Sequence, residues 1–337
     1  MKNLLKTRAM QEKKIGRGED SDPILLDIDN AVVIGVFDGM GGAGSSECSS
    51  DFGEDKTNAY VGSRIVRDVI EAHIKNNIES VSSPGLVEII RSVIKERYAE
   101  EKEKYPPKIK GNLRSSLIKE YPTTMAILTL RDNEDKYLID SYWAGDSRNY
   151  IWGKDGLFQV THDDLKGNVD PLQNIYEDAP LSNCIHADGS FEIHHQSICC
   201  FKKSDKFLLI SATDGCFGYY PSPMDFEQAL IDTLHESSDI SEWENFLSEE
   251  FSAVAADDFS FAIVAVGFKN FREVKDLHKK TELIRAYSER RRSYKGKIRK
   301  KIQLEEQIAK LDKELKAEIE ELWPRYKSRY LKLMQDE

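Results

Sequence analysis

"VVIGVFDGMGG", Val32 to Gly42, is the stretch that decides how the rest of the sequence is interpreted. An apolar run ends at Asp38, and three glycines follow within four positions. The run is typical of a buried strand, and Asp-Gly often marks the turn after one, because glycine adopts backbone angles that other residues avoid. A turn is the simplest interpretation, so other parts of the chain must decide whether Asp38 has a chemical role.

Other carboxylates stand at the ends of apolar strands in the same way. "FLLISATDG" ends a strand on Asp214, "AADDFSFAIVAVG" enters one through Asp257 and Asp258, and "GEDSD" places Glu19 and Asp20 before the first strand. The histidines show no metal-ligand spacing, since His194 and His195 are adjacent and the others stand apart. The sequence therefore predicts an oxygen-only site for Mg²⁺ or Mn²⁺ and no zinc-type site.

Composition limits the class of protein. At 337 residues with 40% apolar content, the chain can fill a real core. No signal peptide or membrane-spanning run is visible, and five cysteines without a CxxC pair favour neither a disulfide framework nor a zinc ribbon. A cytoplasmic location is expected.

Charge divides the chain into an acidic body and a basic tail. Residues 270–337 contain 20 Lys and Arg against 13 Asp and Glu, a net charge of +7. Because the whole chain has a net charge of -11, residues 1–269 carry a net charge of -18. An acidic body is a poor ligand for nucleic acid but is compatible with bound cations.

The predicted elements alternate irregularly. Helices are expected over 59–76 and 86–104, with two shorter ones within 225–250, and strands over 31–37, 124–130, 137–144, 207–212 and 260–267. A pair of helices, a block of strands and further helices favour an α+β sandwich over a parallel doubly wound sheet.

The ordered set "GEDSD … VFDGMGG … TTMAILTL … AGDSRNYIW … THDD … ISATDG … ADDFSFAIV" resembles the metal-dependent protein serine/threonine phosphatases of the PPM (type 2C) family, bacterial members included. The resemblance covers roughly residues 10–268. It implies a central β-sandwich of two antiparallel sheets flanked by helices. It also implies hydrolysis of phosphoserine and phosphothreonine on proteins by a hydroxide that bridges two Mg²⁺ or Mn²⁺ ions, without a covalent intermediate.

The resemblance also assigns roles to single residues. Asp38 matches the ligand that bridges the two ions, and the carbonyl of Gly39 matches the neighbouring ligand of the first ion. Asp214 and Asp257 match the ligands of the second ion. The resemblance makes Asp38, Asp214 and Asp257 the catalytic residues. Glu19 and Asp20 match the acidic pair on the first ion, and Asp146 in "AGDSR" matches the ligand of a third, weaker ion.

The sequence departs from the family pattern at the substrate phosphate. Ile15 stands where the family usually holds an arginine, so Lys14 or Arg17, with Lys13 beside them, is the expected replacement. A lysine would act there as a point charge without the bidentate fork of arginine.

Other departures lie closer to the metals and in the variable segment. Met40 replaces a histidine that some members carry, Asp258 stands where many have Asn, and Asp164 where many have His. Residues 165–203 match poorly and are expected to hold the variable flap.

Residues 269–337 are predicted to form a helical interaction segment, separate from a phosphatase domain over 1–268. Apolar residues from Ile308 to Leu322 step by three and four as in a coiled-coil seam, "SYKGK" around Gly296 favours a helical hairpin, and Pro324 should kink or end the second helix. The other half of the hairpin, a second copy of the chain or a different protein would cover the seam, and a hairpin that also recruits a partner is favoured.

Two alternatives remain open. The chain could be a pseudophosphatase that binds phosphoproteins without turnover, or the tail could be the main effector. "RRRSYKGKIRKK", Arg290 to Lys301, has eight basic residues and no acid, which suits nucleic acid or anionic lipid as well as a solvated helix face.

Overall fold

The structure is a computed structural model that describes residues 4–28, 30–77, 85–106, 118–133, 136–167, 170–176 and 179–330. The chain forms two compact units, Met1–Thr281 and Glu282–Glu337, called here the body and the arm.

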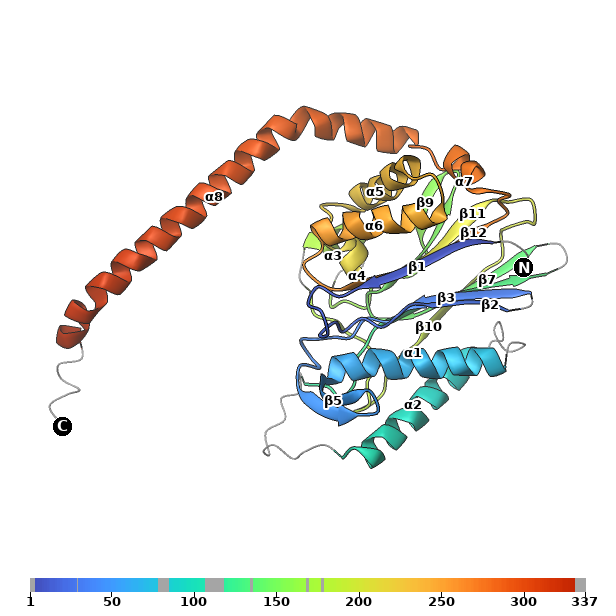
Figure 1. Ribbon diagram of the computed structural model, residues 1–337, viewed down its shortest axis with the longest axis horizontal. Coiled ribbons are helices and arrows are strands. Elements are labelled where there is room, and N and C mark those ends of the chain that lie inside the picture. The colour runs from blue at the N-terminus through green and yellow to red at the C-terminus, as the bar shows by residue number, and fades with distance from the viewer. Residues whose placement is uncertain are drawn as a thin grey trace. The chain divides into compact units, whose positions relative to one another are not determined.

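Two five-stranded antiparallel sheets form the centre of the body (Figure 1). The first sheet has the order β1 (Leu5–Gln11), β12 (Phe259–Val266), β11 (Phe207–Ala212), β8 (Arg148–Gly153) and β9 (Gly156–Gln159). The second sheet has the order β10 (His194–Ile198), β7 (Tyr137–Ala144), β6 (Met125–Asp132), β3 (Ala31–Val36) and β2 (Ile24–Ile28). A separate ribbon pairs β4 (Glu47–Ser50) with β5 (Gly53–Thr57).

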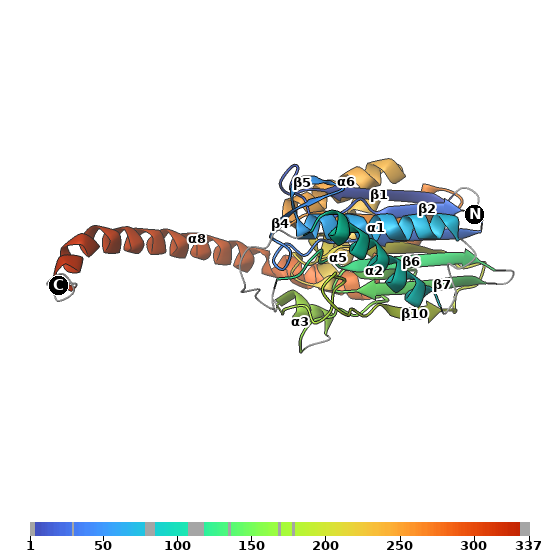
Figure 2. The same cartoon turned by 90° about the horizontal axis from the view of Figure 1, so that it is seen from below.

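Helices cover the outer face of each sheet. The pair α1 (Asn58–Asn76) and α2 (Leu86–Lys104) lies over the second sheet, where Figure 2 shows it in front of the strands. The pair α5 (Pro223–Glu236) and α6 (Ile240–Val254) lies over the first sheet (Figure 1). Two short helices, α3 (Pro171–Tyr176) and α4 (Asp214–Phe217), follow strands of the first sheet.

Strand β3 shows why this sequence stacks four layers. All six of its residues are buried, because alternate side chains point to opposite faces of the sheet and both faces are covered. Val33 belongs to the apolar cluster beneath α1 and α2, whereas Val32 and Ile34 belong to the cluster between the two sheets. The predicted α+β sandwich is confirmed.

The predicted strands and helices of the body appear within a few residues of their expected bounds. Sequence analysis missed β1, whose sequence LKTRAMQ carries charge at alternate positions. It forms an edge of the first sheet and pairs along its length with β12. It also missed β10, which carries two histidines and lies in the poorly matching segment 165–203.

The body extends beyond the boundary predicted at residue 269. Helix α7 (Phe271–Leu277) buries Val274 completely. His278, which is 1% exposed, hydrogen-bonds through Nε2 to the backbone oxygen of Trp152 at 3.0 Å. These contacts make residues up to Thr281 part of the body.

The described residues of the arm form one helix, α8 (Glu282–Tyr330), which contains Pro324 and runs without a break through Gly296. The predicted hairpin is therefore wrong. A glycine inside a helix costs only about 1 kcal/mol, which the surrounding helix-forming residues offset. The seam from Ile308 to Leu322 is exposed, and the side chains of 292–296, 298–299, 302, 306 and 328 lie outside the described residues, as does most of the basic run.

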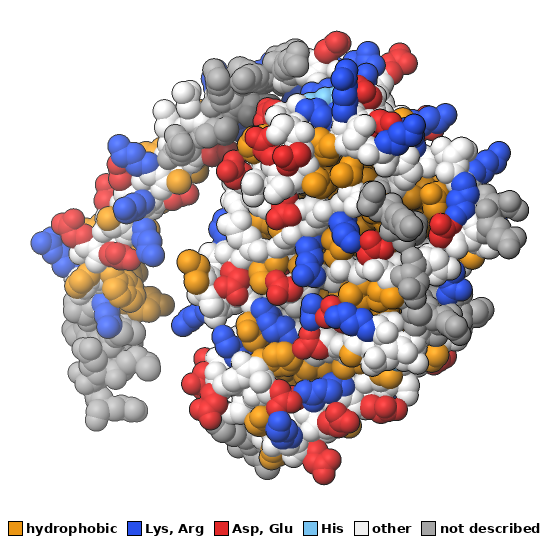
Figure 3. Space-filling view, turned by 45° about the vertical axis from the view of Figure 1, so that its right-hand side comes forward, with side chains coloured by type: hydrophobic (Ala, Val, Ile, Leu, Met, Phe, Trp, Pro, Cys, Tyr) orange, Lys and Arg blue, Asp and Glu red, His pale blue; other side chains and the backbone are white. Residues whose placement is uncertain are grey.

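Charges on the body face of Figure 3 are mixed: Asp and Glu side chains alternate with Lys and Arg and do not gather into one large patch. In the described part of the chain, no helix is both long and apolar enough to cross a bilayer.

Candidate metal centre

Asp38 lies where strand β3 leaves the second sheet. Its backbone oxygen accepts hydrogen bonds from the amide of Thr124 at 2.8 Å and from the hydroxyl of Thr123 at 2.7 Å. Gly39 then forms a β-bridge with Thr123. These bonds fix the half-buried carboxylate of Asp38 at the edge of the sheet.

The glycines after Asp38 are required by close approach. A Cβ at Gly39 would stand 2.5 Å from the backbone oxygen of Ala59 and 2.7 Å from that of Glu19, so no larger residue fits. A Cβ at Gly41 would collide with the Glu19 carboxylate. Small residues after Asp38 therefore allow the segment that carries Glu19 to pack against this loop.

Asp20 and Asp214 reach Asp38 from other segments. Asp20 is 1% exposed, and its Oδ2 accepts a hydrogen bond from the Thr213 hydroxyl at 2.9 Å. Thr213 follows strand β11, and Asp214 begins α4. The Asp38 carboxyl group lies close enough to Asp20 and Asp214 for their charges to act on it. Segments from both sheets thus bring three carboxyl groups together.

Burial and crowding raise the pKa values of these groups. Burial contributes most, and raises the pKa of Asp20 to about 7 and that of Asp146 to about 8, with the charge of Asp214 adding to both. The pKa of Asp38 lies well above its usual range because of burial and of repulsion from Asp20, Asp214 and Asp146. The pKa of Asp214 is also raised, by burial and then by Asp257. Four acids thus share a space that disfavours negative charge.

Glu19 and Asp257 lie at the outer side of this group. The Thr57 hydroxyl, which also caps α1, donates to Glu19 Oε1 at 2.6 Å, and the Glu19 amide donates to Asp258 Oδ2 at 2.7 Å. Burial raises the pKa of Glu19, and the charges of Asp257 and Asp258 add to this effect. Asp257 is exposed. Each carboxylate that the sequence placed at this site therefore lies within electrostatic range of at least one other.

The predicted phosphate-binding residues lie on a turn. The Arg17 amide donates to the Lys14 oxygen at 3.0 Å, and Ile15 between them is 98% exposed. Both Arg17 and Lys14 are exposed, and in the described part of the chain neither forms an ion pair. Lys13 is engaged elsewhere, since its Nζ donates to the Ala255 oxygen at 2.6 Å.

Arg64 is a cation beside the acidic group that sequence analysis missed. Its guanidinium donates to the backbone oxygens of Gly18 and Glu19 at 3.3 Å and of Asp20 at 2.9 Å, and it stacks 3.4 Å from the ring centre of Tyr60. It therefore holds the segment that carries Glu19 and Asp20. Its place in an amphipathic helix gave no signal, because an arginine there is normally a solvated residue.

A buried ion pair anchors the loop that carries Asp146. Arg148 donates to both carboxylate oxygens of Asp163, at 2.9 and 2.6 Å, and both side chains are almost fully buried. The Asn174 amide also donates to Asp163, at 2.9 Å. This bidentate geometry fixes the start of β8 two residues after Asp146.

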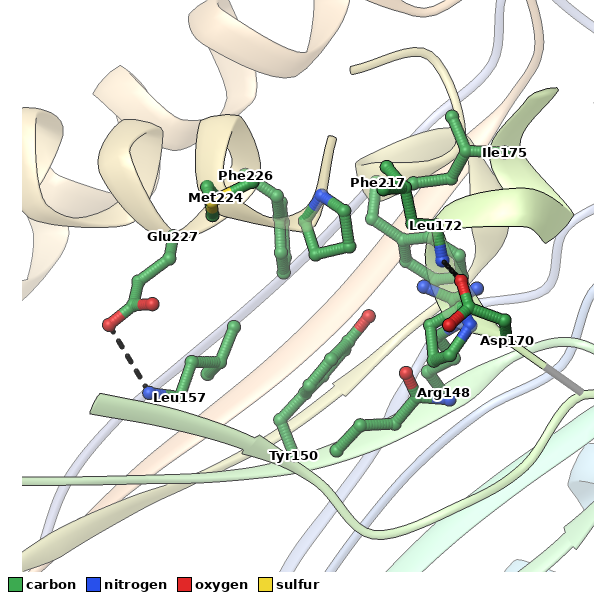
Figure 4. A pocket seen from close by; sticks show the side chains of 13 residues that line it. Arg148, Tyr150, Leu157, Asp170, Leu172, Ile175, Phe217, Met224, Phe226 and Glu227 are labelled. Atoms are coloured by element: carbon green, nitrogen blue, oxygen red, sulfur yellow. Dashed lines mark hydrogen bonds between the residues drawn. The ribbon is translucent and has the colours of Figure 1, made fainter. Parts of the chain in front are cut away.

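A cavity of about 330 Å³ adjoins the other side of Arg148 (Figure 4). It lies between β8, β9, α3, α4 and α5, and Tyr150, Leu157, Phe217 and Phe226 form much of its wall. Its polar groups are already paired: Glu227, for example, accepts from the Leu157 amide at 3.2 Å. The cavity is separate from the carboxylate group.

Two of the histidines lie close together in the fold. His162 and His194, which the sequence keeps far apart, meet beside Asp164, and one potential ligand atom from each of the three lies within 4.8 Å of the others. The spacing of the histidines in the sequence did not indicate this cluster. The fold creates the cluster because β10 pairs with β7 and sets His194 opposite Trp143.

Comparison with solved structures identifies proteins that share this fold. No family model and no curated protein matches the sequence. Among solved structures, the Mycobacterium tuberculosis serine/threonine phosphatase PstP/Ppp is 14% identical, with a TM-score of 0.52, and the match covers 79% of this chain and 99% of that one. The serine/threonine phosphatase Stp1 from Staphylococcus aureus is 16% identical, with a TM-score of 0.51, covering 78% and 95%.

A C. elegans sex determining protein is 16% identical, with a TM-score of 0.55, covering 83% of this chain and 68% of that one. Identities this low establish the architecture and leave the chemistry to be argued from the site. The matches cover almost the whole length of the two bacterial phosphatases. This chain has the fold of the bacterial serine/threonine phosphatases of the PPM type.

Proposed function

We propose that this protein is a metal-dependent hydrolase of phosphoserine and phosphothreonine in proteins. The observation that carries the proposal is the meeting of Asp20, Asp38, Asp146 and Asp214, from segments of both sheets, within a fold shared with serine/threonine phosphatases. Function cannot be inferred from the fold alone, so the chemistry of this site has to support it.

The donor set suits Mg²⁺ or Mn²⁺. All its members are oxygen donors, which these hard ions prefer. The raised pKa values of Asp38 and Asp214 indicate that the negative charges of their ionised forms are not balanced by nearby positive charge. Arg64 and Arg148, two cations near the group, are already engaged, since Arg64 binds backbone oxygens and Arg148 binds Asp163. Divalent cations would supply the missing positive charge.

We propose that Asp38 bridges two ions, that the Gly39 carbonyl, Glu19 and Asp20 serve the first, and that Asp214 and Asp257 serve the second. Asp146, whose pKa responds to Asp214, would hold a third. Bound cations of this kind lower the pKa of water and polarise phosphoryl oxygens. The protein's part is to fix the carboxylates through Thr123, Thr213 and Thr57, so that little reorganisation is needed during the reaction.

The substrate phosphate needs a cation of the protein. Arg17 and Lys14 are the proposed donors, because both are exposed, free of ion pairs within the described residues, and close in sequence to Glu19. Arg17 has the planar fork that matches two phosphate oxygens.

Phosphate release from a phosphothreonine peptide, measured in Mn²⁺ and in EDTA, tests the proposal against a binding module. A hydrolase releases phosphate only with the metal. A pseudophosphatase would retain the peptide without releasing phosphate in either condition, and release that is equal in EDTA would exclude metal dependence.

We also propose that the arm associates with a second copy of itself. Its exposed apolar residues repeat every eleven positions, as Leu304, Leu315, Tyr326; Ile308, Ile319, Tyr330; and Leu311, Leu322. An 11-residue repeat keeps one face of a helix against a partner in a straight or right-handed coil. Identical chains aligned in register satisfy this repeat along their whole length, and a lone amphipathic helix is marginal in water. This supports self-association over the nucleic-acid role of the basic run.

Light scattering on the full chain and on Leu311→Asp tests the arm. We expect the full chain to be a dimer or larger and the variant to be a monomer, because a buried aspartate would oppose pairing. Ala317→Asp is the matched control, since residue 317 lies two and a half helical turns after Ile308 and so on the opposite face of the helix. Identical masses for all three proteins would contradict self-association through this seam.

A further inference from the structure

Two imidazoles and one carboxylate converge on the far side of the Asp146 loop. His162 and Asp164 lie on the segment after β9, and His194 begins β10. His194 Nε2 lies 2.9 Å from Asp164 Oδ1, and the ring centres of His162 and His194 are 5.0 Å apart. Asp164 is buried, His194 half-buried and His162 exposed.

The surroundings orient Asp164 as a metal ligand would be oriented. Its Oδ2 accepts hydrogen bonds from the Gly145 amide at 2.9 Å and from Asn183 Nδ2 at 2.7 Å. These donors fix the carboxylate and turn Oδ1 toward His194. Bonds of this kind from outside the ligand set are characteristic of protein metal sites.

A second carboxylate, that of Glu192, lies on the other side of the His194 ring from Asp164. Glu192 Oε1 lies 3.7 Å from His194 Nδ1, so the nitrogen away from Asp164 faces an acceptor. Asn183 ties Glu192 in place, since its Oδ1 accepts from the Glu192 amide at 3.0 Å. When no ion is bound, Nε2 carries the proton and donates it to Asp164 at 2.9 Å. A metal ion between these two atoms would replace that proton, and the ring could then be protonated on Nδ1, on the side of Glu192.

Trp143 forms a wall against both imidazoles. Its ring centre lies 4.9 Å from that of His162 and 5.2 Å from that of His194. The wall limits ring positions and leaves the cluster open on the side where His162 is exposed. A simple ion pair of His194 with Asp164 would need neither the second imidazole nor this enclosure.

We propose that His162, Asp164 and His194 form a binding site for a borderline divalent ion of the Zn²⁺ class, separate from the carboxylate centre. Two nitrogens and one oxygen match the three-ligand sets of open zinc sites, whose fourth position water fills. The exposed His162 ring supplies the small movement that brings the ligand atoms from their present spacing to bonding distance.

The site is joined to the carboxylate centre by a short route. The Asp164 amide donates to the Gly145 oxygen at 3.0 Å, and the Gly145 amide returns a bond to Asp164 Oδ2. Gly145 directly precedes Asp146. An ion on Asp164 would therefore fix the loop that carries Asp146 to strand β10.

Calorimetric titration of the full-length chain with Zn²⁺, in excess Mg²⁺, tests the site without relying on hydrolysis. Mg²⁺ occupies the oxygen-only centre, and a Cys199→Ser, Cys200→Ser background removes two exposed thiols that could also bind Zn²⁺. We expect one Zn²⁺ per chain. His162→Ala, Asp164→Asn and His194→Gln should each weaken binding by roughly 10-fold or more, the range seen when metal-site partners are removed.

His195→Ala is the matched control, because His195 lies beside His194 on β10 but bonds Asp140, at 2.9 Å. It should bind Zn²⁺ like the parent. His194→Gln keeps an amide donor for Asp164, and circular dichroism confirms that each variant is folded. Co²⁺ in place of Zn²⁺ should give visible absorption bands in the parent and not in His162→Ala. No binding in the parent, or equal binding in His162→Ala and the parent, would overturn the proposal.

Discussion

Asp20, Asp146 and Asp214 all lie close enough to Asp38 for their charges to disfavour its ionisation. Metal-binding sites commonly place carboxylates this close together, because a bound cation relieves the repulsion between them and so binds more tightly. The hydrogen bonds of Thr213 to Asp20 and of Thr57 to Glu19 hold the acids together without neutralising them. At the residue scale, this repulsion supports the proposal that the site binds a cation.

The metal-free protein should lose stability as pH rises. In the folded chain the pKa of Asp20 is about 7 and that of Asp146 about 8, against an ordinary value of 3.8, so the folded state holds protons that the unfolded state has released. The stabilising effect of the protonated forms is complete below pH 3.8 and is lost as pH rises through 7 and 8. Thermal unfolding in EDTA should give a lower Tm at about pH 8 than at about pH 5.5.

Mn²⁺ should reverse this trend, because it replaces the displaced protons. We expect it to raise the Tm strongly at the higher pH and weakly at the lower one. A Tm in EDTA that does not fall with pH, or an equal effect of Mn²⁺ at both values, would contradict the carboxylate pKa values described above.

At the element scale, the loop after β3 is shaped by what lies against each glycine. Gly39→Ala would push its Cβ into the backbone oxygens of Ala59 and Glu19, at 2.5 and 2.7 Å, which only a backbone shift can relieve. Overpacking of this kind costs about 1–3 kcal/mol, so the free energy of unfolding should fall by that amount in urea titrations.

Gly41→Ala should act differently, because its Cβ would meet only the end of the Glu19 side chain. The fold should persist while Mn²⁺ binds more weakly. Gly42→Ala is the control, since nothing lies within 4 Å of its Cβ. Equal stability of Gly39→Ala and Gly42→Ala would show that the close approach is not as tight as described.

The elements also show which signals a sequence carries. Strands β3, β11 and β12 were predictable because both faces are buried, which leaves unbroken apolar runs. Strand β1 was not, because an edge strand with alternating exposure carries lysine and arginine. Asp38, Asp214 and Asp257 were predictable because each follows or precedes such a run. Asp146 was indicated only by the family resemblance, and Arg64 and the histidine cluster depend on contacts between segments that no local pattern records.

The arm shows the opposite error. Gly296 indicated a turn, but helix propensity summed over many neighbours outweighs one glycine, so α8 is continuous. At the whole-molecule scale the chain consists of a compact body and a unit whose described residues form one long helix.

Two truncations locate the end of the body. A chain that stops at Thr281 should keep the stability and metal-dependent hydrolysis of the full chain and should be monomeric. A chain that stops at Lys269 lacks α7, whose Val274 is fully buried, and loses the bond of His278 to Trp152. Removal of such a buried side chain costs roughly 2–5 kcal/mol, so this shorter chain should unfold at a clearly lower temperature. Equal unfolding temperatures for the two would contradict the boundary at Thr281.

The most direct measurement of the whole proposal is the rate of Mn²⁺-dependent phosphate release from a phosphothreonine peptide by the full chain, Asp38→Asn and Asp155→Asn. Asp38→Asn keeps nearly the same volume but removes the charge at the centre of the acidic group, so the rate should fall by roughly 100-fold or more, as when one preorganised electrostatic contact is lost. Asp155 lies exposed in the turn between β8 and β9, and the same substitution there should leave the rate unchanged. A full-chain rate retained by Asp38→Asn, or no metal-dependent release by the full chain, would contradict a phosphatase centred on Asp38.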